Sequence, residues 1–218
     1  NLKGWYHPHL MDMMNREDKR HEDEAYYDYI IGQRNNNDVN AIYTMEDAVF
    51  SGCFLNMCLR NCDIVQMACF SPVVNTRGAI FTHKDGIVLR PTYFVYDLYV
   101  NLVKDTVLDL WTEGVPTVTG KLDDRERTVG LVDAVVTYGD GAYAIAAVNK
   151  DPERVQTFEL RMLDDSVTEM RIHTLNGPAT DSYNDIGRTE VGITASEWMP
   201  CTGTVSLEPH SVNVIELR

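Results

Sequence analysis

Apolar residues follow a helical spacing in the first half of this chain and an alternating pattern in the second half. Before Asp105 they recur every three or four positions in several segments, which is typical of amphipathic helices. From Asp105 onward, apolar and polar residues alternate in short runs separated by Gly, Pro, Asn and Asp. Such runs are typical of antiparallel strands and their turns. The pattern therefore predicts two regions, residues 1–104 and residues 105–218.

Two helices are predicted in the first region. Thr44 is a favourable N-cap residue, and Glu46 and Asp47 follow in the first turn, where negative charge stabilises a helix. Apolar residues continue at helical spacing as far as Leu59. Pro91 begins the second helix, since proline fits the first helical position.

Residues 63–70 separate these helices and are nearly all apolar. This composition is typical of a parallel strand that is buried on both faces. A parallel strand needs parallel neighbours, and each neighbour arrives through a crossover of a dozen or more residues. No second strand of this kind precedes it in the sequence. The first region is therefore predicted to be the closing piece of a larger α/β body, with a loop over residues 71–90.

The second region is predicted to form an antiparallel β-sandwich. Residues 131–138 and 143–148 are expected to form a hairpin, because Gly139-Asp140-Gly141 between them is a strong turn signal. Regular short strands with turn signals are typical of a sandwich. The further strands are expected at residues 155–162, 168–174, 189–193, 203–207 and 211–217.

Charge and cysteine content exclude several functional classes. The 218 residues carry a net charge of −14, which argues against nucleic acid and anionic membranes as partners. No apolar run is long enough for a membrane span. The five cysteines are odd in number and form no C-x-x-C pair, so neither a disulfide framework nor a zinc site is expected. A reducing, cytoplasmic setting is predicted, and a secreted form stays open.

Three segments resemble the C-terminal part of glycoside hydrolase family 51, the α-L-arabinofuranosidases. Residues 43–56 (YTMEDAVFSGCFLN) are similar to a helix of that family, and residues 63–75 (DIVQMACFSPVVN) are similar to its last barrel strand. Residues 207–217 (LEPHSVNVIEL) look like its closing sandwich strand. The resemblance implies an α/β plus all-β fold. Residues 1–104 would be the remnant of a (β/α)8 TIM barrel, and residues 105–218 a jelly-roll-like antiparallel β-sandwich.

The resemblance also implies an activity. Family members are retaining hydrolases that remove terminal α-L-arabinofuranosyl residues from arabinan, arabinoxylan or their oligosaccharides, using two glutamates. By resemblance the nucleophile Glu lies just before Asn1 and the acid/base Glu further upstream. A shorter family spacing would place Asn1 at the Glu position, where Asn cannot act as the nucleophile. No catalytic residue is therefore expected in this chain, and the chain alone is predicted to be inactive.

Four residues are candidates for substrate binding. By resemblance, Trp5 forms an apolar wall of the sugar site, with packing beside the barrel rim as its alternative role. His7 either bonds a sugar hydroxyl or is an exposed loop residue. Asn75 and Arg77 are candidates for sugar contact, and Asn75 alternatively orders the loop through backbone hydrogen bonds, as Asn commonly does. Pro72 stands where the family often has a sugar-contacting Gln, which points to a rebuilt subsite.

No cofactor and no metal are expected, because the histidines and acidic residues between positions 7 and 24 fit no standard metal spacing. The expected partners are an arabinose-containing oligosaccharide or polysaccharide and the missing N-terminal barrel segment. A homo-oligomer, a hexamer by resemblance, is also possible. Two alternatives stay open. One is a carbohydrate-binding or structural sandwich without catalysis, and the other is the same fold with another glycoside specificity, such as xyloside or glucan.

Overall fold

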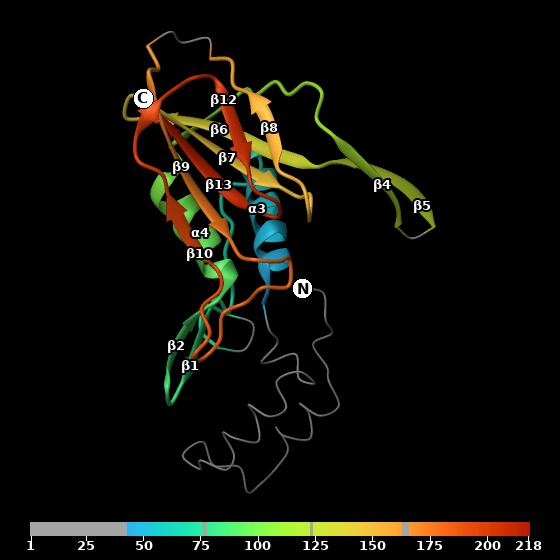
Figure 1. Cartoon of the computed structure of the whole chain (residues 1–218), viewed down its shortest axis with the longest axis vertical. Helices are drawn as coiled ribbons and strands as arrows, with labels where there is room; N and C mark the ends of the chain where they lie inside the picture. Colours follow the sequence, from blue (N-terminus) through green and yellow to red (C-terminus); the bar gives the residue numbers. More distant parts are fainter. Residues whose placement is uncertain (1–42, 76–77, 123, 163–165) are drawn as a thin grey trace, which may run out of the picture.

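The computed structural model describes residues 43–75, 78–122, 124–162 and 166–218. An antiparallel sheet of seven strands organises them, with two helices on one face and a two-stranded sheet on the other (Figure 1). The central strand β13 (Val212–Leu217) lies between β7 (Ala142–Asn149) and β9 (Glu169–Asn176). The remaining strands of this sheet are β3 (Thr106–Leu108), β6 (Val132–Gly139), β10 (Gly192–Ala195) and β11 (Met199–Pro200).

Strand β13 is apolar on both faces because each face packs against a different layer. Val212 and Val214 belong to the core beneath the helices, whereas Ile215 and Leu217 belong to the core on the opposite face. Alternate side chains of a strand point to opposite faces, so a strand with apolar residues at both alternate sets of positions fits the centre of three layers.

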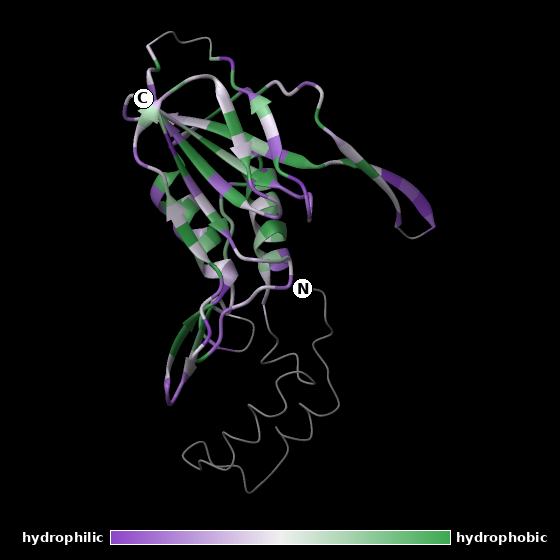
Figure 2. Ribbon diagram, in the orientation of Figure 1, coloured by the Kyte–Doolittle hydropathy of each residue, from purple (hydrophilic) through white to green (hydrophobic). Residues whose placement is uncertain are grey.

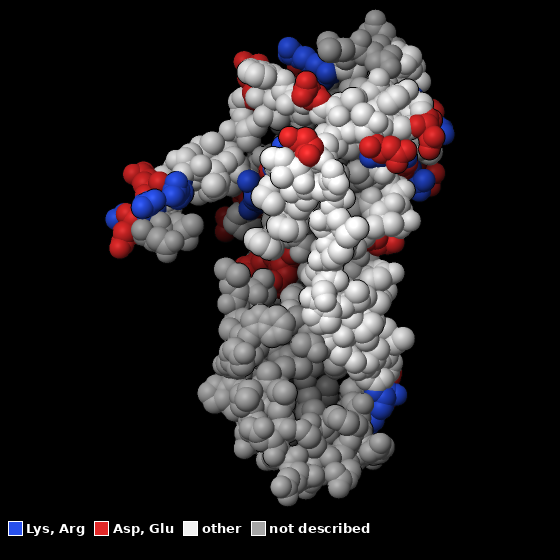
Figure 3. Space-filling model, turned by 180° about the vertical axis from the view of Figure 1, so that it is seen from behind, with Lys and Arg blue, Asp and Glu red and all other residues white. Residues whose placement is uncertain are grey.

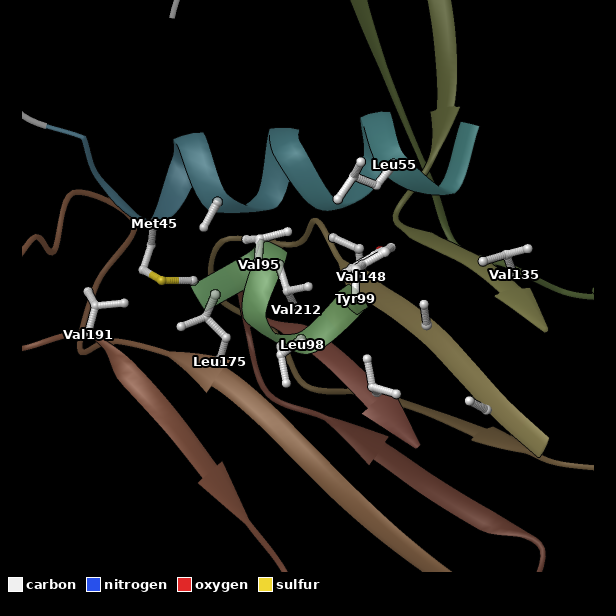
Figure 4. Close-up of a cluster of buried hydrophobic side chains, with 14 residues drawn as sticks. Met45, Leu55, Val95, Leu98, Tyr99, Val135, Val148, Leu175, Val191 and Val212 are labelled. Atoms are coloured by element: carbon white, nitrogen blue, oxygen red, sulfur yellow. The ribbon is translucent and has the colours of Figure 1, made fainter. Parts of the chain in front are cut away.

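The helices α3 (Met45–Arg60) and α4 (Pro91–Leu102) share one core with the sheet (Figure 4). Leu98 of α4 is 2% exposed. At Gly52, α3 approaches the sheet so closely that an added Cβ would lie 3.0 Å from a methyl carbon of Val148. The helices predicted at Thr44 and Pro91 are thus confirmed. The boundary between residues 104 and 105 stays a prediction.

A buried polar network ties both helices to the sheet. The Tyr99 hydroxyl on α4 donates to Asn56 Oδ1 at 2.7 Å, and Asn56 Nδ2 on α3 donates to Asp133 Oδ1 at 2.8 Å. Arg60 also reaches Asp133, with its two terminal nitrogens 3.0 and 2.9 Å from the two carboxylate oxygens. Since buried polar groups are costly when unpaired, the network holds the two helices in one arrangement.

The opposite face of the sheet is covered by β8 (Gln156–Glu159) and β12 (Thr204–Leu207), which pair with each other. Val205 and Leu207 of β12 are buried against the sheet, and Figure 2 shows the apolar positions along the strands. The prediction of a strand-rich, antiparallel second region is confirmed. The jelly-roll connection and the barrel remnant stay predictions.

The predicted hairpin between β6 and β7 is also confirmed. Its two-residue loop consists of Asp140 with φ 51° and Gly141 with φ 75°. Both values lie in the left-handed region, which a type I′ turn requires and which Asp and Gly tolerate. Neither helix in the described residues combines the length and apolar composition that crossing a membrane requires.

The strand predicted at residues 63–70 is wrong. The chain makes a turn over residues 61–64 and has no regular structure over residues 65–70. Ile64 is 77% exposed and Met67 is 81% exposed. Among the described residues, the parallel pairing present is the isolated bridge between Val74 and Ile80. Without a parallel neighbour there is no ladder to pair the backbone groups of this segment, so the apolar run does not become a strand.

The loop predicted over residues 71–90 contains a hairpin, formed by β1 (Ile80–His83) and β2 (Gly86–Leu89). The structure also contains a second hairpin, β4 (Thr117–Leu122) with β5 (Arg125–Gly130), for which the sequence pattern predicted no separate strands. The strand expected at residues 155–162 is shorter, and the one expected at 189–193 is displaced to β10. These strands are short, and most of their residues are exposed or half-buried, so alternation alone did not mark their ends.

Candidate functional site

One of the four predicted substrate-binding residues lies in the described part of the chain. Trp5, His7 and Arg77 are outside the described residues, so their predicted roles stay predictions. Asn75 is described, and it begins the approach to the β1–β2 hairpin. The candidate site is therefore the segment around Asn75, together with the elements that hold it.

Asn75 orders its own loop. Its carboxamide Oδ1 accepts hydrogen bonds from the Thr82 backbone N–H at 2.8 Å and the Thr82 hydroxyl at 2.9 Å. Its backbone N–H donates to Ile80 O at 2.7 Å, and its φ of 55° lies in the left-handed region that Asn tolerates. The loop-ordering role predicted as the alternative is present. Direct contact with sugar stays a prediction.

Arg90, the residue directly before α4, anchors the same loop. It is 5% exposed, and its NH1 donates to Gly78 O at 2.6 Å. The guanidinium carbon lies 5.0 Å from the ring centre of Tyr43 and 5.4 Å from that of Phe81. A buried guanidinium between two aromatic rings gains cation–π attraction, so this residue fixes the hairpin against the start of α3.

Asn184 connects the hairpin to residues 177–191. Its Nδ2 donates to Leu89 O at 3.0 Å and to Val191 O at 2.8 Å. Its Oδ1 accepts from the backbone N–H groups of Glu190 and Val191 at 2.8 and 2.9 Å. One side chain thus satisfies backbone groups from two segments that lie about a hundred positions apart in the sequence, and it holds them together.

The start of α3 completes this end of the molecule. The Met45 N–H donates to Ser182 O and the Glu46 N–H to Thr180 O, both at 3.0 Å. Asp47 Oδ2 accepts from the Thr44 N–H at 2.9 Å, which caps the helix. The N-terminal N–H groups of α3 are therefore engaged with protein, and the helix start serves as an anchor for residues 177–191.

The described side chains offer little chemistry of their own. Burial raises the pKa of the Cys53 thiol from 9.0 to about 11, so this thiol stays protonated and unreactive near neutral pH. Burial also raises the pKa of Tyr99 well above 10. Within the described ranges, no three His, Cys, Asp or Glu side chains are grouped so that they could hold a metal ion. This part of the chain can shape and support a binding surface.

Sequence reasoning missed Arg90 and Asn184, which hold the candidate loop in place. Their partners lie far along the chain: Gly78 is 12 residues from Arg90, and Leu89 is 95 residues from Asn184. The residues next to Arg90 and Asn184 in the sequence do not indicate these hydrogen bonds. The one available signal is a charged residue directly before Pro91, at the start of a largely apolar helix.

Comparison with known proteins identifies the family. The family model described as "Alpha-L-arabinofuranosidase C-terminal domain" matches residues 5–211. The chain therefore belongs to the alpha-L-arabinofuranosidase C-terminal domain family. The resemblance to the C-terminal part of family 51 arabinofuranosidases noted in the sequence is confirmed.

Individual relatives agree with this family. The chain is 27% identical over 187 residues to a probable alpha-L-arabinofuranosidase C of Aspergillus clavatus, a match that covers 81% of this chain and 35% of the relative. Its fold is similar to an alpha-L-arabinofuranosidase of Thermotoga maritima solved with arabinose, with TM-score 0.71, 25% identity, and coverage of 83% of this chain and 39% of the other. A thermostable GH51 enzyme of Thermotoga petrophila RKU-1 gives TM-score 0.73 and 26% identity, with coverage of 84% and 40%. The chain spans about a third of the length of the curated relatives it matches.

Proposed function

We propose that this chain is the C-terminal part of a retaining α-L-arabinofuranosidase that removes terminal α-L-arabinofuranosyl residues from arabinan, arabinoxylan or their oligosaccharides. The observation that carries the proposal is the match of residues 5–211 to a domain family named for that enzyme. Likeness in fold to an arabinofuranosidase solved with arabinose supports the substrate class.

The proposed reaction is a double displacement. A retaining glycosidase needs two carboxyl groups about 5–5.5 Å apart, one to attack the anomeric carbon and one to protonate the leaving oxygen. We propose that both come from polypeptide outside these 218 residues. In this arrangement residues 1–104 join the end of the barrel, where the further polypeptide would supply the parallel neighbours that residues 63–70 lack. Trp5, His7, Asn75 and Arg77 would line the sugar pocket. The anchored loop of Asn75 would hold its part of that pocket rigid.

An exposed apolar stripe on α3 supports docking of further polypeptide. Phe50, Phe54 and Met57 are 61%, 44% and 43% exposed and follow one another at helical spacing. The opposite side of α3 is buried on the sheet, so the helix is apolar on two faces, which is typical of a buried helix. Figure 3 shows a broad surface without charged residues on the side of the molecule that carries the helices. We infer that this stripe packs against the portion that the longer relatives have in addition.

The test compares the purified 218-residue chain with a longer polypeptide that includes its upstream sequence. We expect release of nitrophenol from an aryl α-L-arabinofuranoside by the longer protein, with retained anomeric configuration by NMR, and none by the shorter chain. Turnover by the chain alone would overturn the external location of the carboxylates. Hydrolysis of a xyloside or glucan instead would favour another glycoside specificity.

The docking surface has its own test in the longer protein. Phe54→Glu should weaken contact between the two portions and lower both thermal stability and activity, because it buries a charge in an apolar contact. Val155→Glu is the matched control, since Val155 is 49% exposed and directly precedes β8, which covers the face of the sheet opposite α3. If the two substitutions lower thermal stability and activity equally, α3 is not part of the proposed contact.

Trp111 supports a second candidate, a carbohydrate-binding sandwich without catalysis. This ring is 88% exposed, and an exposed aromatic face offers a large apolar area to the C–H surface of a sugar. Calorimetric titration of the chain with arabino-oligosaccharides tests this candidate. Binding that is lost in Trp111→Ala would favour the carbohydrate-binding candidate. If the chain binds no arabino-oligosaccharide, this candidate is rejected and the hydrolase proposal stands by itself.

Two further expectations belong to the same proposal. The protein is proposed to self-associate, with hexamers implied by the family resemblance, and to work in a reducing, cytoplasmic setting. All five cysteines are free thiols in the structure, which supports the second expectation. Sedimentation analysis of the purified protein tests the first.

A further inference from the structure

The hairpin of β4 and β5 forms an arm that projects from the body of the molecule (Figure 1). The two strands pair with each other, and neither pairs with another strand of the described chain. Almost every residue along the arm is exposed. A two-stranded hairpin is marginally stable in water by itself, so the arm is expected to have a partner.

The strand register gives the arm two different faces. On one face Val118 lies opposite Val129, Gly120 opposite Arg127, and Leu122 opposite Arg125. We call Val118, Val129, Arg125 and Arg127 the basic face. Neither arginine makes an ion pair with another described residue, and neither has an acidic residue opposite it.

The other face of the arm is polar and balanced in charge. The hydroxyl groups of Thr119 and Thr128 are 2.8 Å apart and share a hydrogen bond, and Lys121 lies opposite Glu126. Figure 3 shows side chains of both signs close together at the end of the arm. The unbalanced positive charge therefore lies on the basic face, next to a pair of exposed valines.

The rest of the chain complements this face. Residues 131–218 contain 14 Asp and Glu against six Lys and Arg, and the whole chain has a net charge of −14. A second copy therefore attracts the two arginines. The arm contains no aromatic residue, which disfavours sugar stacking, and the acidic body disfavours nucleic acid.

We propose that the basic face of the arm docks on residues 131–218 of a second copy of this chain, the region in which acidic residues exceed basic ones. The inference rests on the proposed self-association and gives it a location. In a closed symmetric assembly each copy would both extend an arm and receive one. Arginine next to apolar side chains is a composition typical of protein interfaces. Salt screens contacts between exposed charges, so such a contact should weaken as the salt concentration rises.

Sedimentation velocity of the full chain tests the arm. At low salt we expect concentration-dependent association of the unaltered chain, and weaker association in about 0.5 M salt. Arg125→Glu with Arg127→Glu should weaken association about tenfold or more, because both contacts become repulsive. The matched control is Lys121→Glu with Glu126→Lys, which changes the same number of charges on the other face and keeps an opposite-charge pair. This control should associate as the unaltered chain does.

Each outcome decides the proposal. A monomer at every concentration overturns both self-association and the arm contact, and leaves the proposed hydrolase activity to its own assay. Association that is equal in the unaltered chain and the double arginine variant overturns the arm contact alone. Equal weakening in the arginine variant and in the control overturns the assignment to the basic face. If the glutamate variant misfolds by circular dichroism, Arg125→Gln with Arg127→Gln should give a smaller loss of association, and no loss would count against the arm.

Discussion

Helix α3 and the segment that follows it, residues 63–70, are both rich in apolar residues, yet their structures differ. Helix α3 buries Met45, Ala48 and Leu55 on the sheet. In the following segment, Ile64 and Met67 are 77% and 81% exposed. A helix closes its hydrogen bonds within itself, whereas a strand takes them from neighbours. Apolar composition therefore suffices for the first element and not for the second.

The largest contrast should appear on truncating one apolar side chain in each setting. Leu98→Ala removes a side chain from the helix–sheet core and should lower the free energy of unfolding by about 2–5 kcal/mol. Met67→Ala should change it by less than about 0.5 kcal/mol, since Met67 contributes little buried area. Urea denaturation monitored by circular dichroism measures both. A comparable loss in the two variants would mean that residues 63–70 are packed in solution.

A second contrast uses glycines. Gly52→Val pushes a side chain into the contact between α3 and the sheet and should cost about 1–3 kcal/mol. Gly120→Val is the control, because no atom lies within 4 Å of its added Cβ and valine favours a strand. Thermal unfolding should separate the two. If both were neutral, α3 would not lie as close to the sheet as described.

Alkaline pH should weaken the helix core through Cys53. Its folded pKa of about 11 exceeds its ordinary value of 9.0 because of burial. The unfolded chain therefore releases this proton first, so stability is kept below pH 9 and is lost as pH rises toward 11. The difference between the unaltered chain and Cys53→Ala should change by about 1–2 kcal/mol across that window. Tyr99 acts in the same direction, and because the Cys53 charge helps to raise the pKa of Tyr99, the difference reports the two buried groups together. A constant difference would contradict burial of the thiol.

The smallest effect is expected at Asn75. Asn75→Gly keeps the left-handed backbone but removes the acceptor of two hydrogen bonds from Thr82. We expect a loss of about 1 kcal/mol or less and faster amide hydrogen exchange at Thr82. Thr82→Val removes only the hydroxyl donor. The backbone N–H at position 82 should therefore exchange more slowly in this variant than in Asn75→Gly. Unchanged exchange in Asn75→Gly would show that the side chain does not order this loop.

The sequence predicted the helices and the β6–β7 hairpin because their signals are local. Thr44 and Pro91 mark helix starts, and Asp140-Gly141 fits a turn that few other residue pairs tolerate. The family was predicted from residues 43–56, 63–75 and 207–217, and the family match confirms it. For the candidate site, the sequence predicted Asn75 but not its anchors Arg90 and Asn184, whose hydrogen-bond partners lie 12 and 95 residues away in the chain.

By itself, the sequence determined where backbone conformation follows from neighbouring residues: the helices, the turns, the alternating strands and the acidic charge. Only the tertiary structure decided which apolar residues are buried, how Arg90 is enclosed, and that β4 and β5 extend away from the sheet. The physical reason is the range of the interactions. Caps and turns act over a few residues, whereas burial and strand pairing depend on groups brought together from distant parts of the chain.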